Sequence, residues 1–157
     1  MEQEFANTVI HIGVVVADLE KSMRFYKDII GMVQIDKTSF DLDEDFTRRT
    51  GLTGGIPMHV EVLKLGSGST ATQFKLMSFG GLAQPVENDY VYNHTGMQYI
   101  TLQFAELEPL LARLKENDIP LLGETPTPLK GGRYFVFVKD PDGTFIECIG
   151  PMKRENA

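Results

Sequence analysis

The stretch HIGVVVADLEKSMRFYKDIIGM, residues 11–32, decides the fold because it runs from a strand directly into a helix. The β-branched run from Thr8 to Val16 is too short for a helix and predicts a strand. Asp18 then stands where a helix N-cap belongs, and Gly31 stands where a C-cap belongs. Between the caps, apolar residues recur along one predicted helical face at Leu19, Met23, Tyr26 and Ile30.

The remainder of the first half predicts three more strands and one excursion. We expect the strands over Met32–Ser39, Met58–Leu65 and Thr70–Phe79, with the last two joined as a hairpin at GSGS. Residues 41–55 are acidic and contain glycine, which indicates a surface excursion with one helical turn. Such an excursion would either cover a cavity or decorate the surface.

The second half repeats the same order of elements. A constant shift carries the strand and helix of residues 11–26 onto residues 99–114, with an acidic residue again before the helix. We then expect a strand from Ile119 and a strand pair at Arg133–Lys139 and Thr144–Gly150. The connector of that pair, DPDG at residues 140–143, has the proline and glycine positions of a type I turn.

The repeat predicts an α+β fold of two βαβββ modules that form a cupped mixed sheet around a central cavity. We place the modules at residues 8–79 and 96–150, joined by a linker at residues 80–95, within a single domain over residues 8–150. Each module would cover one face of its sheet with one helix, which leaves the other face for function.

The composition excludes several classes of function. The 157 residues fit one domain, and a net charge of -7 repels nucleic-acid phosphates and anionic lipids, so we expect neither nucleic acid nor membrane as a partner. Cys148 is the single cysteine, which excludes an internal disulfide framework and a multi-cysteine metal cluster. We therefore expect a cytoplasmic protein.

Three motifs together resemble the vicinal oxygen chelate superfamily, which includes glyoxalase I, methylmalonyl-CoA epimerase, extradiol dioxygenases and bleomycin-resistance proteins. The motifs are the opening stretch at residues 11–32, its second copy near residues 99–107, and DPDGTFIE at residues 140–147. The resemblance covers nearly all of residues 8–150. It implies a glyoxalase-like fold, a small-molecule ligand and a homodimer.

The resemblance also implies four ligand positions on the first and last strands of the two modules. In metal-dependent members these hold His, Glu, His or Gln, and Glu, and His11 and Glu147 match two of them. The third position falls on Tyr99, with Gln98 one residue away, and the fourth falls on Lys75. One hypothesis is a divalent Zn, Ni, Fe or Mn ion held by His11 and Glu147, with Gln98 or Tyr99 as a third ligand. The other is a cavity without metal, in which the ammonium of Lys75 replaces the ion, because an ammonium has no lone pair to donate.

The two hypotheses leave two functions open. The first is a lyase or isomerase, in preference to a dioxygenase, with Glu147 as general base and Lys75 or Tyr99 polarising a carbonyl. The second is a non-catalytic, metal-free protein that binds a ligand or confers drug resistance. Taken singly, the same residues also suit ordinary structural roles, such as an ion pair between Lys75 and Glu147.

Strand parity extends the candidate site, because alternate residues of a strand share a face. It adds Gln73 and Met77 beside Lys75, and Thr101 and Gln103 beside Tyr99. The predicted ligand-binding residues are His11, Gln73, Met77, Thr101, Gln103, Arg133 and Phe145.

For the other potentially reactive side chains we predict structural or surface positions rather than catalytic roles. The same parity turns Cys148 away from Glu147, which predicts a buried hydrophobe rather than a nucleophile. We expect His59 and His94 to lie on the solvated surface.

Overall fold

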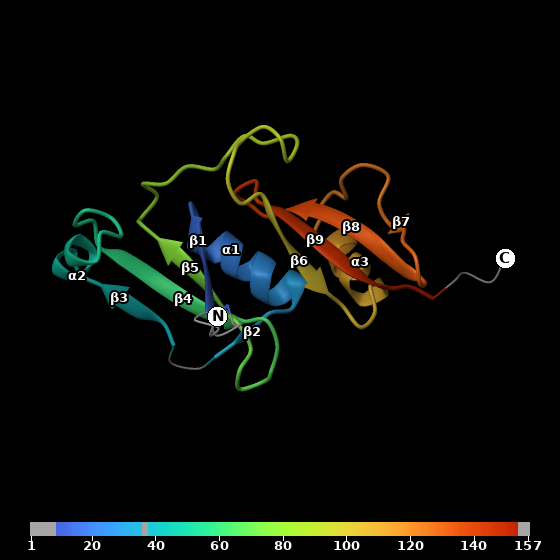
Figure 1. Cartoon of the computed structure of the whole chain (residues 1–157), viewed down its shortest axis with the longest axis horizontal. Coiled ribbons are helices and arrows are strands. Elements are labelled where there is room, and N and C mark those ends of the chain that lie inside the picture. The colour runs from blue at the N-terminus through green and yellow to red at the C-terminus, as the bar shows by residue number, and fades with distance from the viewer. Residues whose placement is uncertain (1–8, 36–37, 154–157) are drawn as a thin grey trace, which may run out of the picture. The chain divides into compact units, whose positions relative to one another are not determined.

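The computed structural model describes residues 9–35 and 38–153 of the chain. The chain divides between Gln84 and Pro85 into two compact units, here named the N-unit and the C-unit. Each unit combines one mixed β-sheet with helices (Figure 1). The predicted α+β class with two βαβββ modules is confirmed.

The N-unit sheet has the strand order β1-β5-β4-β2, and β3 pairs with β4. Strands β1 and β5 run parallel, whereas β4 and β5 form the predicted antiparallel hairpin. The elements are β1 (His11–Val16), α1 (Leu19–Met23), η1 (Arg24–Ile30), β2 (Val33–Gln34), β3 (Phe40–Leu42), α2 (Glu44–Arg49), β4 (Met58–Lys64) and β5 (Gln73–Ser78).

Both predicted caps of the first helix are confirmed. The Asp18 carboxylate accepts a hydrogen bond from the Lys21 backbone N–H at 3.1 Å, and Gly31 has the left-handed φ of 96° that ends the helix. Between the caps, the α-helix α1 gives way to the π-helix η1, so the apolar stripe differs from the one predicted. Tyr26 packs against the sheet with its ring 4.7 Å from that of Phe74. The buried residues of η1 are Phe25, Tyr26, Ile29 and Ile30.

The prediction of a single strand over Met32–Ser39 is wrong. Two short strands, β2 and β3, pair with β4 one after the other. Between them the Thr38 hydroxyl donates to the Ile35 carbonyl at 2.7 Å, and residues 36–37 of the predicted strand lie outside the described residues. The strand expected from Thr70 also begins later, because residues 68–71 form a turn in which the Ala71 N–H bonds to the Gly68 carbonyl.

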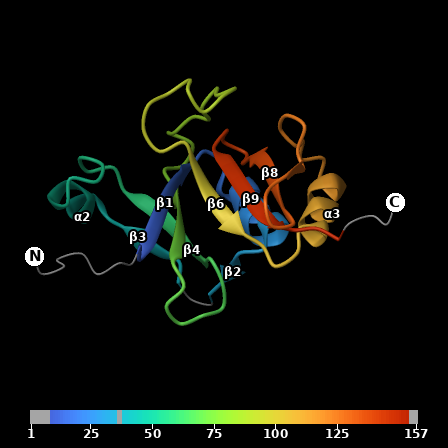
Figure 2. The same cartoon turned by 45° about the vertical axis from the view of Figure 1, so that its right-hand side comes forward.

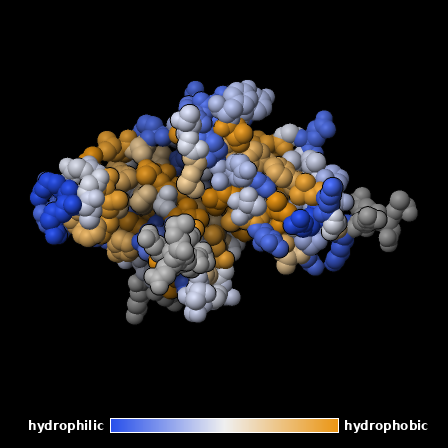
Figure 3. All heavy atoms as spheres, viewed as in Figure 1, coloured by the Kyte–Doolittle hydropathy of each residue, from blue (hydrophilic) through white to orange (hydrophobic). Residues whose placement is uncertain are grey.

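The excursion at residues 41–55 contains one short helix, α2, at the outer edge of the N-unit sheet (Figures 1 and 2). The Asp43 carboxylate caps this helix by accepting from the Phe46 N–H at 2.8 Å. Arg48 and Arg49 both form ion pairs with Asp45. Hydrophilic residues gather at this end of the visible face in Figure 3, so α2 is a solvated element.

The C-unit sheet has the order β6-β9-β8-β7, with β6 and β9 parallel and β8 and β9 antiparallel. The Asp140 carbonyl accepts from the Gly143 N–H at 3.1 Å, as expected for the turn at DPDG. Its elements are β6 (Tyr99–Gln103), α3 (Glu108–Glu116), β7 (Thr127–Pro128), β8 (Arg133–Lys139) and β9 (Phe145–Pro151).

Two predictions for the C-unit are wrong. No strand begins at Ile119, because its N–H bonds to the Leu114 carbonyl and closes the end of α3. The second strand of the module is β7 instead. The N-cap of α3 is Leu107, without a side-chain hydrogen bond, so no acidic cap repeats that of Asp18.

Strand registers establish which residues of the two units correspond. His11 pairs with Gln73 in the N-unit, and Tyr99 pairs with Phe145 in the C-unit. Two residues further on, the same parallel ladders pair position 13 with Lys75 and position 101 with Glu147. Lys75 and Glu147 therefore occupy the same place in their two sheets, as the sequence repeat predicts.

Candidate functional site

Each sheet has a helix face, packed against the helix of its own unit, and an opposite face that we call the open face. In the N-unit, Phe74 contacts Tyr26 of η1 on the helix face. In the C-unit, Gly150 lies against Leu107 at the start of α3. Since side chains alternate along a strand, residues 73, 75 and 77 of β5, and 145, 147 and 149 of β9, lie on the open faces.

The open face of the N-unit brings four predicted site residues together. Parallel pairing sets His11 beside Gln73 and Val15 beside Met77, with Lys75 between these rows. The Lys75 ammonium lies 5.5 Å from the centre of the Phe40 ring, in cation–π range. The N-unit therefore offers one imidazole, one amide and the cation of Lys75 on this face, and Lys64 of β4 lies opposite Gln73 at its edge.

The open face of the C-unit holds the other predicted group. Glu147 lies on the central strand β9, between Thr101 of β6 and Phe137 of β8. Tyr99 is exposed, and its ring makes an edge contact with Phe137 at 6.0 Å. The same face carries the predicted residues Gln103, Arg133 and Phe145.

Glu147 is the most unusual side chain of this face, because only 9% of it is exposed. Among the residues that the structure describes, none forms a hydrogen bond or ion pair with its carboxylate. Neither carboxylate oxygen is among the fully buried polar atoms that lack a partner, so the carboxylate reaches the surface although most of the side chain is covered. Its lone pairs are available to a ligand.

A hollow of about 610 Å³ lies on the same open face, although Glu147 is not part of its lining. Phe137, the cross-strand neighbour of Glu147, and Phe145 lie in its wall, and both belong to the open face. Its full lining is Asp89, Tyr90, Val91, Tyr92, Leu122, Gly123, Thr125, Phe135, Phe137, Lys139 and Phe145. Sequence reasoning found only Phe145 of this set, although parity from Arg133 would have placed residues 135, 137 and 139 on the same face.

Gln98 does not join the open face of the C-unit. Its side-chain amide accepts from Asn88 and donates to the Gly96 carbonyl, each at 3.4 Å. Its amide is therefore occupied by neighbouring residues of the C-unit.

Cys148 is fully buried on the helix face, as predicted. Burial, with a smaller contribution from the Glu147 charge, raises the pKa of its thiol to about 12. The thiol is therefore protonated at neutral pH and does not act as a nucleophile.

The residues of neither unit, taken by itself, fit a divalent metal. The open face offers His11 in one unit and Glu147 in the other, and the N-unit position that corresponds to Glu147 holds the ammonium of Lys75. Within the described ranges, no group of three or more His, Cys, Asp or Glu side chains could hold an ion. We therefore derive no chemistry through a metal.

A second polar cluster lies outside the predicted site. The His59 Nδ1 lies 2.7 Å from an Asp41 oxygen, and its Nε2 lies 3.1 Å from a Glu61 oxygen. Hydrogen bonds to both carboxylates raise the pKa of His59. His59 lies at the surface, as expected, with 37% of its side chain exposed. The sequence did not reveal its two carboxylate partners, because Asp41 reaches His59 only through the pairing of β3 with β4. His94 is exposed, as predicted.

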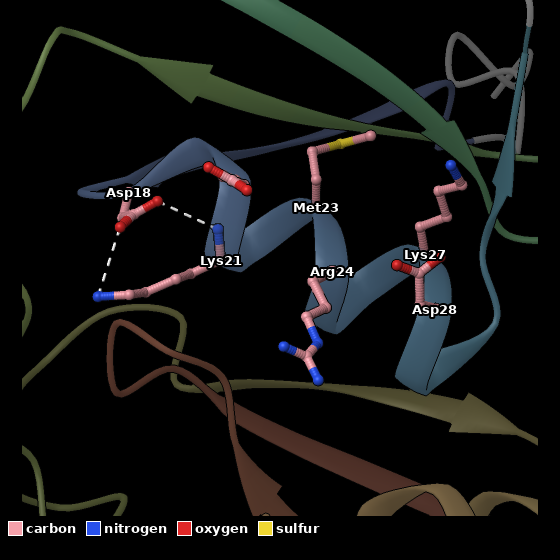
Figure 4. Close-up of a pocket in the computed structure, with 7 residues that line it drawn as sticks. Asp18, Lys21, Met23, Arg24, Lys27 and Asp28 are labelled. Atoms are coloured by element: carbon pink, nitrogen blue, oxygen red, sulfur yellow. Dashed lines mark hydrogen bonds and ion pairs between the residues drawn. The ribbon is translucent and has the colours of Figure 1, made fainter. Parts of the chain in front are cut away.

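A hollow beside the first helix, about 530 Å³ in volume, is lined largely by charged side chains of α1 and η1 (Figure 4). In it, Lys21 bonds to Asp18 both through its backbone N–H and through an ion pair at 3.4 Å. These contacts cap the helix, and we assign the hollow no further role. None of the described helices has the length and apolar character needed to span a membrane.

The family model of the Glyoxalase/Bleomycin resistance protein/Dioxygenase superfamily matches residues 8–148. No curated protein matches the sequence.

Solved structures share the fold at low sequence identity. A glyoxalase family protein from Bacillus cereus superposes with a TM-score of 0.76 and 15% identity, covering 98% of this chain and 99% of its own. Trypanothione-dependent glyoxalase I from Leishmania major gives a TM-score of 0.63 and 22% identity, with 92% and 87% covered. A glyoxylase/bleomycin resistance protein/dioxygenase domain from Frankia sp. EAN1pec gives 0.66 and 17%, with 98% and 96% covered. With its duplicated βαβββ plan and this family match, the chain belongs to the Glyoxalase/Bleomycin resistance protein/Dioxygenase superfamily.

Proposed function

We propose that the protein binds a small, largely apolar organic molecule in the hollow on the open face of the C-unit. The observation that carries this proposal is the hollow of about 610 Å³, walled by Phe135, Phe137 and Phe145. Binding sites for small molecules are typically concave, mostly apolar and of this size, with a few polar groups that orient the ligand. Lys139 is such a group in the lining, and Glu147 lies on the same face beside Phe137.

A second candidate function, a lyase or isomerase acting by proton transfer, is favoured by Glu147 alone. Its side chain is mostly buried next to Phe137, a residue that lines the hollow, and its carboxylate has no hydrogen-bond partner among the described residues. A general base needs a free lone pair within reach of the proton it removes, and apolar surroundings strengthen its interaction with the substrate. Tyr99 and Thr101, on the adjacent strand, carry hydroxyls that could donate to a developing oxyanion.

The predicted residues of the N-unit stay candidates for ligand contacts. His11, Gln73 and Lys75 share one open face, where they provide hydrogen bonds and a positive charge. The homodimer, the central cavity between the modules and an ion pair of Lys75 with Glu147 also stay predictions.

Fluorescence titration with N-phenylnaphthylamine, a neutral aromatic probe, tests the binding proposal. We expect saturable binding, and a loss of about tenfold in affinity when Phe137→Leu removes one ring from the hollow. Phe46→Leu, an exposed phenylalanine on α2, is the matched control and should bind as the parent does. Equal affinity of both variants would contradict the placement of the site.

Deuterium exchange at the methylene group of phenylacetone, followed by proton NMR in D₂O, tests the second candidate. The parent protein should accelerate exchange, and Glu147→Gln should abolish the acceleration while the probe still binds. A parent rate equal to that in buffer would reject proton transfer and leave binding as the function.

A further inference from the structure

One wall of the hollow comes from the linker, in residues 89–92. The rings of Tyr90 and Tyr92 stack at 5.5 Å with an angle of only 5° between their planes. The side-chain oxygen of Asn93 holds the backbone turn here, because it accepts from the N–H groups of Asp89 and Tyr90. The linker therefore places two parallel, stacked tyrosine rings in the lining of the hollow, and both rings are exposed enough to meet a ligand.

The floor of the hollow is also built from flat rings. Phe137 stacks on Phe145 at 5.1 Å with 11° between the planes, and Phe135 lies 5.5 Å from Phe137. Aromatic rings favour offset-stacked or edge-to-face partners at centroid distances of about 4.5–7 Å. Rings in both the wall and the floor therefore favour a planar aromatic ligand over an aliphatic one of equal area.

The hollow is lined by one cationic and one anionic side chain, and the cation belongs to the less exposed residue. The residue Lys139 is half-buried; its ammonium lies 5.3 Å from the centre of the Phe145 ring and takes part in no ion pair among the described residues. Asp89 also lines the hollow, but it is exposed, so solvent screens its carboxylate more strongly. An anionic group beside Lys139 would form a charge-assisted hydrogen bond that the protein itself leaves unmade.

We propose that the hollow selects a planar aromatic anion, with the ring system against the tyrosine wall and phenylalanine floor and the anionic group at Lys139 Nζ. This inference rests on the proposed function and names its ligand class. Binding of such a ligand requires the charge of Lys139 and the stacked rings of Tyr90 and Tyr92. Variants of the lysine and of the tyrosines test these two requirements separately.

Two fluorescent probes that differ by one charged group provide the test. Anilinonaphthalene sulfonate carries the anion, and N-phenylnaphthylamine has nearly the same rings without it. In the full-length protein, Lys139→Met should weaken sulfonate binding about tenfold and leave the neutral probe within about twofold. Lys139→Arg should restore sulfonate binding, because it keeps the charge.

The controls separate the possible failures. Lys115→Met removes an exposed lysine of α3 and should change neither probe, whereas the double variant Tyr90→Leu and Tyr92→Leu should weaken both. Equal affinity of Lys139→Met and the parent for the sulfonate would overturn the anion assignment while the neutral probe still supports binding. Failure of the parent to bind either probe would overturn the proposed function itself.

Discussion

The N-unit and C-unit share a backbone plan but present different surfaces on their open faces. Where the C-unit has the rings Phe135, Phe137 and Phe145, the matching ladder positions of the N-unit hold Val60, Val62 and Gln73. The centre of each helix face stays apolar, with Leu76 in the place of Cys148. At the outer strand the helix faces differ, because His59 and Glu61 of the N-unit stand where the C-unit has Tyr134 and Val136. The comparison indicates that packing against the helix constrains the positions it covers, while the open face diverged in chemistry.

The largest expected effect comes from giving the C-unit a residue of the N-unit on the helix face. Gly150 corresponds to Ser78, but a Cβ at position 150 would lie 2.7 Å from the Phe104 carbonyl oxygen. That backbone is held in place by the Phe104 N–H, which bonds to the Ile149 carbonyl. Gly150→Ser should therefore lower the free energy of unfolding by about 3 kcal/mol, measured by urea denaturation.

The control gives the N-unit a residue of the C-unit, at a position on the open face. Gly13 corresponds to Thr101, and a Cβ there would meet only the flexible end of Met77, at 3.0 Å. Gly13→Thr should change the free energy of unfolding by less than about 1 kcal/mol. If it costs as much as Gly150→Ser, the open face is as tightly packed as the helix face and the contrast fails.

Replacing the corresponding residues Glu147 and Lys75 by methionine should change the free energy of unfolding by smaller amounts and in opposite directions. Glu147→Met replaces a mostly covered side chain, whose carboxylate lacks a partner among the described residues, with an apolar one of similar size, so we expect a gain of about 1 kcal/mol in unfolding free energy. Lys75→Met removes a cation from the Phe40 ring and should cost about 0.5 kcal/mol. Thermal denaturation of both variants in the same buffer checks the signs, and a loss with Glu147→Met would mean that its carboxylate stabilises the fold.

The duplicated plan could be predicted from the sequence because apolar spacing and turn residues repeat along the chain. Alternation along β5 and β9 was enough to place Gln73, Lys75 and Glu147 on the correct faces of their sheets. Such inferences depend only on local periodicity. For that reason they hold even where the pairing partner of a strand is not known.

The missed features all depend on contacts between distant segments. Asp41 reaches His59 only because β3 pairs with β4, and the tyrosine wall forms only because Tyr90 and Tyr92 line the same hollow as β8. A polar linker without apolar periodicity gives no signal of that placement. The prediction of a strand from Ile119 is wrong because the Ile119 N–H bonds to the Leu114 carbonyl at the end of α3.

The next prediction concerns pH and applies to the N-unit alone. Tyr134 and Val136 of the C-unit stand where the N-unit has His59 and Glu61, so only the N-unit has an imidazole between carboxylates. The pKa of His59 is raised above its ordinary 6.5, so protonated His59 stabilises the fold below about pH 6.5. That stabilisation should disappear as pH rises through the raised pKa, and the change should be modest because 37% of the side chain is exposed.

Urea denaturation from pH 6 to pH 9 measures this decline. His59→Gln keeps a polar side chain but cannot take up a proton, so its stability should vary less over the same range. An identical pH profile in the parent and the variant would show that the Asp41 and Glu61 contacts do not depend on the charge of His59.

The smallest expected effect is the change in melting temperature when a chelator is added. This experiment tests most directly whether the Lys75 ammonium takes the place of a metal ion. If the ammonium of Lys75 has replaced an ion, EDTA should leave the melting temperature within about 1 °C of its value in buffer. A metal present at about 100 times its Kd would add about 2.7 kcal/mol, so its removal would lower the melting temperature by several degrees. Elemental analysis of untagged protein gives an independent reading of the same question. A stoichiometric divalent ion, with a fall on chelation, would mean that the two repeats still serve one metal and that their divergence concerns only the ligand.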